Sequence, residues 1–281
     1  MRLAVVGHVE WVEFVRVEHV PAQGEIVNAS DAFEEAAGGG AVAAIQLVRL
    51  AGEADFFTAL GNDQLADRSR ERLEGLGARV VSASRDQPTR RALTLVDDAG
   101  ERTIITIGSR LQPELGDGID WEALSGTDGV YFTAGDADAL RAARRARVLV
   151  ATPRAGEVLH EAGVELDALV YSENDVVESK AARELTPSPA LMVATRGAAG
   201  GSYTTAAGET GSWEPVAPPG PVIDAYGSGD SFAAALTYGL AAGAEPREAL
   251  QLAARAGATC LTGRGPYGRQ LTSADSVPFG R

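Results

Sequence analysis

The feature that most constrains the fold is a repeated alternation of short apolar segments with segments of helical periodicity. Apolar runs of strand length recur along the chain, and most are followed by apolar residues spaced as on one face of a helix. Such alternation builds a mostly parallel sheet with helices on both faces, and ligands then bind outside the carboxyl ends of the strands. The expected strands are residues 3–6, 55–60, 129–133, 147–151, 168–171 and 191–195. The expected helices are residues 41–50, 63–76, 136–145, 156–161, 175–184, 232–244 and 246–261.

Two regions, residues 10–29 and 90–107, interrupt this alternation. The second contains two β-rich runs joined through Asp97-Asp98-Ala99-Gly100-Glu101, a sequence typical of a hairpin turn. We expect one three-layer α/β/α domain over residues 1–281, with a small β lid formed from about residues 10–36 and 88–108. An edge extension of the main sheet is the alternative that periodicity leaves open.

Composition limits the class of partner. A net charge of −14 argues against nucleic acid and anionic lipid, because neither would meet a basic surface. It allows a phosphate ligand where free backbone amides change the local field. The single cysteine, Cys260, excludes an intrachain disulfide and a cysteine-based metal site. No apolar run reaches the roughly 20 residues of a membrane span, and the first residues lack signal-peptide features, so we expect a cytoplasmic protein.

The stretch from Asp224 to Phe232 carries the chemistry. Its small residues, Gly227-Ser228-Gly229, precede Asp230, and a helical pattern begins at once. Amides at such a helix start point at a ligand, and the helix dipole favours negative charge there. An acid beside this anion site is explained if it takes a proton from a hydroxyl while the amides hold a phosphoryl group. The alternative is an ordinary helix start with Ser228 or Asp230 as its cap.

With these segments in order, the chain resembles the ribokinase-like (PfkB) family of carbohydrate and nucleoside kinases over nearly its full length. The similarity rests on five ordered segments. They are the glycine-rich residues 37–44, Gly61-Asn62-Asp63 with the residues up to Val80, the turn at residues 97–103, Thr195-Arg196-Gly197-Ala198-Ala199-Gly200, and residues 224–232 followed by 253–265.

This resemblance implies an ATP-dependent kinase with Mg²⁺ as cofactor and a sugar, sugar acid or nucleoside as the small-molecule acceptor. Asp230 is then the general base, and the amides of Gly227, Ser228 and Gly229 form the anion hole. Asp224 supports the loop or a monovalent cation. The residues implied at the nucleotide are Thr195, Arg196, Gly197, Gly200, Asp224, Ala256 and Gly257.

The segment that the resemblance implies at the metal ion departs from the family pattern. Where the family carries Asn-x-x-Glu, this chain reads Tyr171-Ser172-Glu173-Asn174-Asp175, and Ser172 and Asp175 fill those places. Asp175 and Glu173 are the candidate metal residues. A solvated helix start, stabilised by the helix dipole, is the alternative for both acids.

The acceptor end departs further. Glu10 and Val12 stand where the family places an Asn or Asp pair, and Val42 replaces an asparagine of the first glycine signature. Glu10 is the best candidate for binding a hydroxyl or amine of the acceptor. A structural role is the alternative for His8, and lid packing for Trp11. The candidate acceptor residues are Glu10, Trp11, Gly38, Gly39, Gly40, Val42 and Asp230.

Two functions of different classes follow. The first is a PfkB-type kinase, and the second is a catalytically weak relative that binds small molecules or regulates. Intact Gly-Ser-Gly-Asp favours the kinase, since a binder needs no base beside an anion site. A dinucleotide-dependent dehydrogenase is excluded, because Gly7-His8-Val9-Glu10 follows the first strand in place of Gly-x-Gly-x-x-Gly. The family resemblance also suggests a homodimer formed through the lid.

Overall fold

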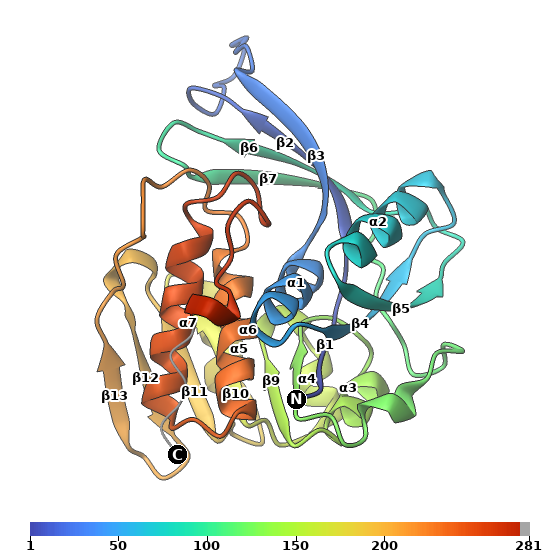
Figure 1. Ribbon diagram of the computed structural model, residues 1–281, viewed down its shortest axis with the longest axis vertical. Coiled ribbons are helices and arrows are strands. Elements are labelled where there is room, and N and C mark those ends of the chain that lie inside the picture. The colour runs from blue at the N-terminus through green and yellow to red at the C-terminus, as the bar shows by residue number, and fades with distance from the viewer. Residues whose placement is uncertain (276–281) are drawn as a thin grey trace.

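The computed structural model of the chain describes residues 1–275 of 281. Two sheets organise them: a nine-stranded sheet in the order β13-β12-β11-β10-β9-β8-β1-β4-β5, and a four-stranded sheet in the order β3-β2-β6-β7. The small sheet stands at one end of the large one (Figure 1). Within these residues, no helix is both long and apolar enough to cross a membrane.

The large sheet follows the predicted alternation. Its strands are β1 (Leu3–Val6), β4 (Ala54–Leu60), β5 (Ala78–Ser84), β8 (Gly129–Phe132), β9 (Val148–Ala151), β10 (Ala168–Ser172), β11 (Leu191–Thr195), β12 (Gly201–Thr205) and β13 (Thr210–Trp213). The helices are α1 (Gly39–Ala51), α2 (Gln64–Gly75), α3 (Ala137–Ala143), α4 (Val158–Ala162), α5 (Val176–Glu184), α6 (Ser228–Ala241) and α7 (Pro246–Cys260). The three-layer α/β/α class is confirmed.

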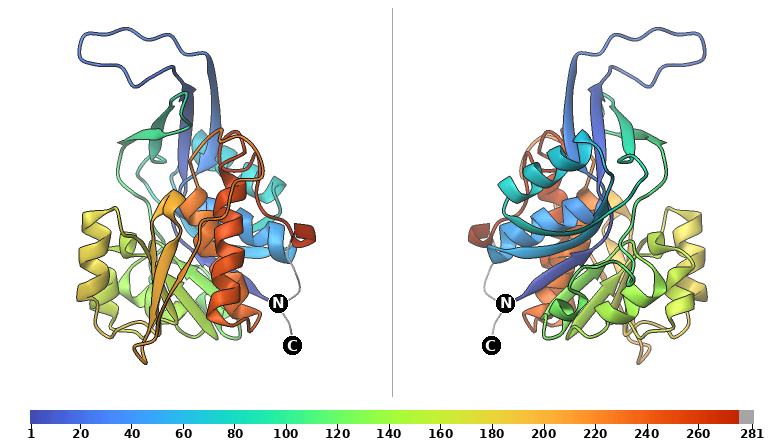
Figure 2. Two further views of the ribbon diagram at one scale, coloured as in Figure 1. Left: turned by 90° about the vertical axis from the view of Figure 1, so that its left-hand side faces the viewer. Right: turned by 90° about the vertical axis from the view of Figure 1, so that its right-hand side faces the viewer.

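Helices cover both faces of this sheet (Figure 2). Successive strand residues point to opposite faces, so Val5 and Val150 pack in one apolar cluster while Val6 and Ala151 pack in the other. The first cluster lies under α1, α6 and α7, and the second under α3, α4 and α5. The central strands are buried on both faces, which explains their unbroken apolar runs.

The edges of the large sheet were not predicted. β5 lies at one edge, and β12 and β13 pair antiparallel to β11 at the other. These strands are rich in glycine, serine, threonine or arginine and are only half-buried, so they lack the apolar signal on which the prediction depends.

The small sheet is separate from the large one, and we call it the lid sheet. It contains β2 (Glu10–Arg16), β3 (Asp31–Ala37), β6 (Arg91–Val96) and β7 (Arg102–Ile107), all from the two regions that break the alternation. The alternative of an edge extension is therefore wrong. Asp97 forms the expected turn, since its Oδ1 accepts from the amides of Ala99 and Glu101 at 3.0 and 2.9 Å.

The lid sheet touches the loop that precedes α6. The amide of Ala225 donates to the carbonyl of Gly100, in the turn between β6 and β7, at 2.9 Å. Phe14 of β2 stacks on Phe33 of β3 and meets the ring of Tyr226 edge-on. Backbone and aromatic contacts thus hold the lid sheet against the Asp224–Phe232 stretch.

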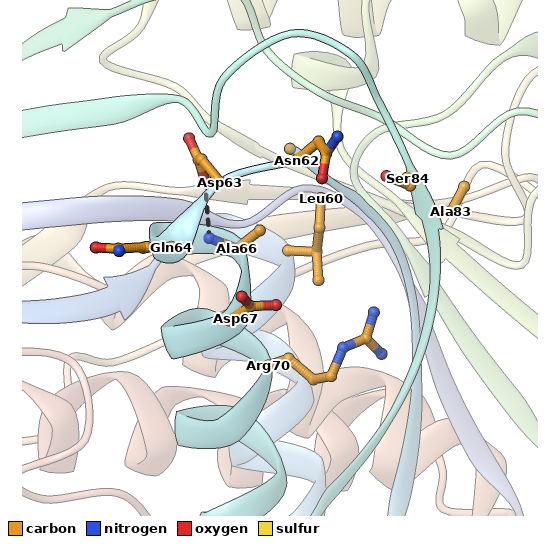
Figure 3. A pocket seen from close by; sticks show the side chains of 10 residues that line it. Leu60, Asn62, Asp63, Gln64, Ala66, Asp67, Arg70, Ala83 and Ser84 are labelled. Carbon is orange, nitrogen blue, oxygen red and sulfur yellow. Dashed lines mark hydrogen bonds between the residues drawn. The ribbon is translucent and has the colours of Figure 1, made fainter.

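A polar cavity of about 380 Å³ opens at the carboxyl ends of β4 and β5 (Figure 3). Asp63 on its rim caps α2, because its Oδ1 accepts from the amide of Ala66 at 2.9 Å. Its other oxygen accepts from the amide of Thr89 at 2.8 Å. The resemblance placed Asp63 in a family segment, and the structure gives it a structural role.

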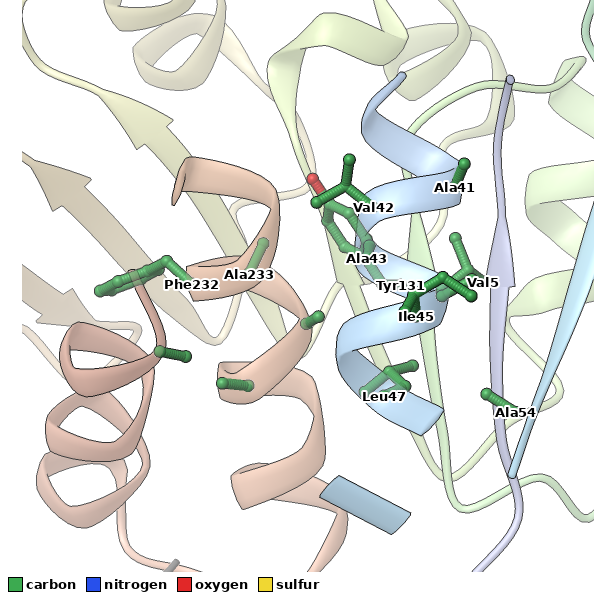
Figure 4. Close-up of a cluster of buried hydrophobic side chains, with 14 of the residues drawn as sticks. Val5, Ala41, Val42, Ala43, Ile45, Leu47, Ala54, Tyr131, Phe232 and Ala233 are labelled. Carbon is green, nitrogen blue, oxygen red and sulfur yellow. The ribbon is translucent and has the colours of Figure 1, made fainter. Parts of the chain in front are cut away.

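Helix α1 lies against β1 and beside α6 (Figure 4). A Cβ added to Gly40 would lie 2.7 Å from the carbonyl oxygen of His8 and 2.8 Å from its amide nitrogen. Only a glycine lets the first turn of α1 approach the backbone after β1 so closely.

The first prediction compares two helix glycines. Gly40→Ala should lower the free energy of unfolding by at least about 1–3 kcal/mol, because its methyl group meets rigid backbone. The control Gly75→Ala, where a Cβ meets nothing within 4 Å, should be neutral or stabilising by up to about 1 kcal/mol. Urea unfolding measures both, and equal stability of the two variants would contradict this packing.

Candidate active site

The N-terminal ends of α1 and α6 meet at the carboxyl end of β8. A Cβ added to Gly39, the first residue of α1, would lie 2.8 Å from Oδ1 of Asp230 and 3.5 Å from Oγ1 of Thr133. Asp230 lies in the first turn of α6. The carboxylate therefore lies directly against residues 38–40 at the start of α1, which we call the glycine turn. The two glycine-rich motifs predict this contact.

Asp230 is half-buried and makes no ion pair within residues 1–275. Burial raises the pKa of its carboxyl group above the ordinary value, against the opposing positive charges of Arg154, His8 and Arg102. Glu178 adds to the upward shift of this pKa. A raised pKa makes a carboxylate a stronger base, which is the property that a proton acceptor at neutral pH requires.

The first amides of α6 are available to a ligand. Gly227 is the N-cap, with φ of 81°, and no side chain caps the helix. The amide of Ser228 has only a long contact, 3.5 Å, to the carbonyl of Ala225. In the described part of the chain, the amides of Gly227, Gly229 and Asp230 have no hydrogen-bond acceptor. A Cβ on Gly229 would meet open space, so this turn presents donors to an anion.

Asp224 fixes the loop before α6. Its buried carboxylate accepts from the amides of Tyr226 at 2.8 Å and Gly265 at 3.1 Å. Burial raises the pKa of Asp224, although these two amides oppose the shift. Since both oxygens hold backbone amides, this geometry favours the loop-supporting role over a cation ligand.

Tyr226 connects this loop to α1. Its hydroxyl accepts from the amide of Gly38 at 3.0 Å, and its ring is buried. The sequence motif contained this tyrosine without giving it a role. The hydrogen bond fixes the spacing between the two helix starts, and hence between Gly39 and Asp230.

Glu10 lies beside the same glycine turn. A Cβ on Gly38 would lie 3.0 Å from Cγ of Glu10 and 3.2 Å from Cδ2 of His8. Oε1 of Glu10 lies 3.2 Å from Nε2 of His8, and Oε2 is buried with no hydrogen-bond partner. Burial raises the pKa of Glu10, but His8, Arg90 and Arg110 outweigh it and hold the pKa below the ordinary value. Glu10 is therefore an anion whose Oε2 makes no hydrogen bond within the described residues.

Three arginines at this site were not predicted. Nε of Arg90, which precedes β6, lies 3.5 Å from Oε2 of Glu10. Arg110, which follows β7, donates from Nη1 to the carbonyl oxygen of Arg154 at 3.2 Å. Arg154, after β9, donates to the buried Glu178 at 2.5 Å. No motif marks them, because the fold brings them together from distant segments.

Three predicted acceptor residues do not face the acceptor site. Trp11 points to the opposite side of β2 from Glu10, because strand residues alternate, and it packs under Arg68 of α2, 4.1 Å from the ring centre. Val42 is fully buried and packs under Gly227. Gly40 packs on the backbone of His8. The predicted substrate contacts of the Trp11 and Val42 side chains are therefore not found. Trp11 packs between the lid sheet and α2 instead.

The predicted nucleotide residues lie in two places, at the end of β11 with the turn that follows it, and in α7. Thr195 donates to the carbonyl of Tyr171 at 3.1 Å, and Arg196 lies 3.7 Å from Glu173. Gly197 and Gly200, with positive φ, form the turn after β11. Gly257 of α7 lies close to the carbonyl of Ser228. Ala256, predicted at the nucleotide, is fully buried in the core, so its side chain does not face a ligand.

The candidate metal acids lie at the end of β10. Asp175 caps α5, its Oδ1 accepting from the amides of Val177 and Glu178. Glu173 lies beside Arg196 and is partly exposed. Over residues 1–275, no three histidine, cysteine or acidic side chains gather closely enough to hold a metal ion. One or two carboxylates fit a Mg²⁺ ion that is shared with phosphates.

The chain is similar to known proteins over nearly its full length. The model of the pfkB family carbohydrate kinases matches residues 1–149 and 125–272. A ribokinase of Arabidopsis thaliana is 26% identical over 290 residues, 94% of this chain and 76% of its own length.

Solved structures show the same fold. The ribokinase of Thermotoga maritima superposes with a TM-score of 0.78 at 24% identity, covering 98% of this chain and 97% of that one. The Arabidopsis thaliana ribokinase complexed with ribose and ATP gives a TM-score of 0.75 at 20% identity, covering 98% and 96%. The family match spans nearly all the described residues, and the chain belongs to the pfkB family of carbohydrate kinases.

Proposed function

We propose that the protein transfers the γ-phosphoryl group of ATP to a hydroxyl of a sugar, sugar acid or nucleoside. The observation that carries this proposal is the position of Asp230, between the glycine turn of α1 and the free amides of α6. A ribokinase of the same fold has been solved with ribose and ATP, which supports these two classes of ligand here.

Asp230 acts as the general base in this proposal. Its carboxylate accepts the proton of the acceptor hydroxyl as the alcohol oxygen bonds to the γ-phosphorus. The bond from that phosphorus to the bridging oxygen breaks, and ADP leaves with the electron pair. The raised pKa of Asp230 helps it to hold the proton.

The first turn of α6 stabilises the charge on the transferring group. The amides of Gly227 and Gly229 have no competing acceptor within the described residues, and they are fixed before the ligand arrives. Ser228 contributes its amide once its long contact to Ala225 is released. Loss of one such donor typically costs roughly 10²–10³ in rate.

The nucleotide lies on the side of the turn after β11. That side is bordered by Thr195, Arg196, Gly197 and Gly200. Gly257 lies behind the first turn of α6. Glu173 and Asp175 would hold Mg²⁺ together with the nucleotide phosphates, and the ion would neutralise part of their charge. The lid sheet covers the acceptor side and excludes water.

The experiment that tests the function measures ATP-dependent phosphorylation of a panel of sugars, sugar acids and nucleosides. Asp230→Asn should lower kcat/KM at least about 10²-fold, because it removes the proton acceptor and keeps the shape. Asp67→Asn is the matched control, since Asp67 is an exposed acid in the first turn of α2. Full activity of the Asp230 variant, or ATP and acceptor binding without turnover in the native chain, would contradict the proposal.

The same substitution should stabilise the protein. The pKa of Asp230 is raised on folding, so the folded state binds its proton more tightly than the unfolded state. Stability from this group is present at low pH and is lost as the pH rises through the shifted pKa. Asn has no such loss, so Asp230→Asn should have the higher Tm at pH 7–8, with the difference shrinking toward the ordinary pKa of Asp, about 3.9.

Thermal unfolding monitored between about pH 4 and pH 8 checks this sign. Asp67→Asn, at an exposed position, is the control in the same measurement. A lower Tm of Asp230→Asn at neutral pH would mean that the ionised carboxylate stabilises the fold, which contradicts the upward shift of its pKa on burial.

A further inference from the structure

The acceptor side of the site contains more positive charge than the proposed reaction requires. Arg90, Arg110 and Arg154 come from three separate segments and converge beside Glu10 and Asp230. Phosphoryl transfer from ATP calls for cations at the nucleotide phosphates, whereas these three lie with the acceptor residues. Their presence needs another explanation.

Two of the three have carboxylate neighbours. Arg154 pairs with Glu178 at 2.5 Å, and Arg90 lies near Glu10. Arg110 has none: within residues 1–275 it forms no ion pair, and the one hydrogen bond from its side chain goes to the carbonyl of Arg154. An anion bound there would supply the negative charge that Arg110 lacks.

The electrostatic surroundings of Arg110 favour an anion at this place. Desolvation by the surrounding protein lowers its pKa, and the nearby charges of Arg90 and Arg154 lower it further, while Glu10 opposes the shift. The residue is nevertheless exposed, so an anion from solution can reach the guanidinium. A bound anion would relieve the repulsion among the three arginines.

Unsatisfied buried atoms mark the same place as a ligand site. Oε2 of Glu10, Nδ1 of His8 and Nε of Arg90 are buried and make no hydrogen bond, although Oε2 and Nε lie 3.5 Å apart as an ion pair. Glu10 and His8 are each 8% exposed. Buried polar atoms without partners are rare, and here a donor, an acceptor and a ring nitrogen occur together. Hydroxyl groups of a sugar would satisfy them.

We propose, on the basis of the phosphotransferase function above, that the acceptor is an anionic sugar derivative. Its carboxylate or phosphate group binds Arg110, with Arg154 and Arg90 beside it. Glu10 accepts from one of its hydroxyls, and Asp230 deprotonates another. Arginine suits this role because its planar fork matches carboxylate and phosphate oxygens.

The test uses matched pairs of acceptors. D-gluconate is compared with D-glucose, and D-fructose 6-phosphate with D-fructose, at saturating ATP and Mg²⁺. The charged member of at least one pair should have the higher kcat/KM, by about 10-fold or more. The pair that responds shows whether the group is a carboxylate or a phosphate.

Substitution of Arg110 assigns the effect. Arg110→Gln should lower kcat/KM for the charged acceptor about 10–100-fold, mainly through KM, and leave the uncharged member within about threefold. Arg110→Lys should restore part of the loss, because it keeps the charge without the fork. Arg49→Gln, an exposed arginine in the last turn of α1, is the control and should change neither.

The outcomes separate two failures. Phosphorylation of the uncharged acceptors with no preference for charge, or an equal effect of Arg110→Gln on both members, overturns the anionic acceptor and leaves the kinase proposal intact. Failure to consume ATP with any acceptor overturns both. Thermal shift with each acceptor alone gives a readout without turnover: the charged member should raise Tm in the native chain and not in Arg110→Gln.

Discussion

The approach of Asp230 to Gly39 is the contact on which the site depends. It requires that the first turns of α1 and α6 come together without a side chain between them. A Cβ at Gly39 would take the space of the carboxylate, and one at Gly227 would lie 2.8 Å from Val42. The two glycine-rich motifs therefore serve one geometric purpose, which is to bring a carboxylate and two helix N-termini within reach of one ligand.

Several hydrogen bonds hold this approach in place. The Tyr226 hydroxyl accepts from the amide of Gly38, and the Asp224 carboxylate accepts from the amide of Gly265. The carbonyl of Gly100, in the turn between β6 and β7, accepts from the amide of Ala225. These bonds join the loop before α6 to α1, to the segment after α7 and to the lid sheet. The free amides and the half-buried carboxylate are then available to the ligand, and they are held in position before it binds.

The sequence predicted the fold class, the lid regions and the Asp230 turn, because these depend on local patterns. Apolar periodicity marks the central strands, and a run of small residues before an acid marks the start of α6. The edge strands β12 and β13 escaped prediction, since half-exposed polar strands carry no such pattern. Family motifs supplied the functional interpretation.

The acceptor side is built from residues that are distant in the sequence. Arg90, Arg110 and Arg154 are distant in sequence and lie in no motif, so only the folded chain reveals that they converge. Trp11 and Val42 belong to motif segments but point away from the site, because strand alternation and helix packing decide which side a residue faces. Glu10 and Trp11 are neighbours in one motif segment, yet only Glu10 faces the glycines at the start of α1.

The dependence of kcat/KM for the acceptor on pH, at saturating MgATP, tests most directly whether Asp230 is the base. The profile should fall on the acid side with an apparent pKa above about 3.9, the ordinary value for aspartate, as protonation of Asp230 removes the proton acceptor. Activity that persists unchanged below that pH would contradict the central claim.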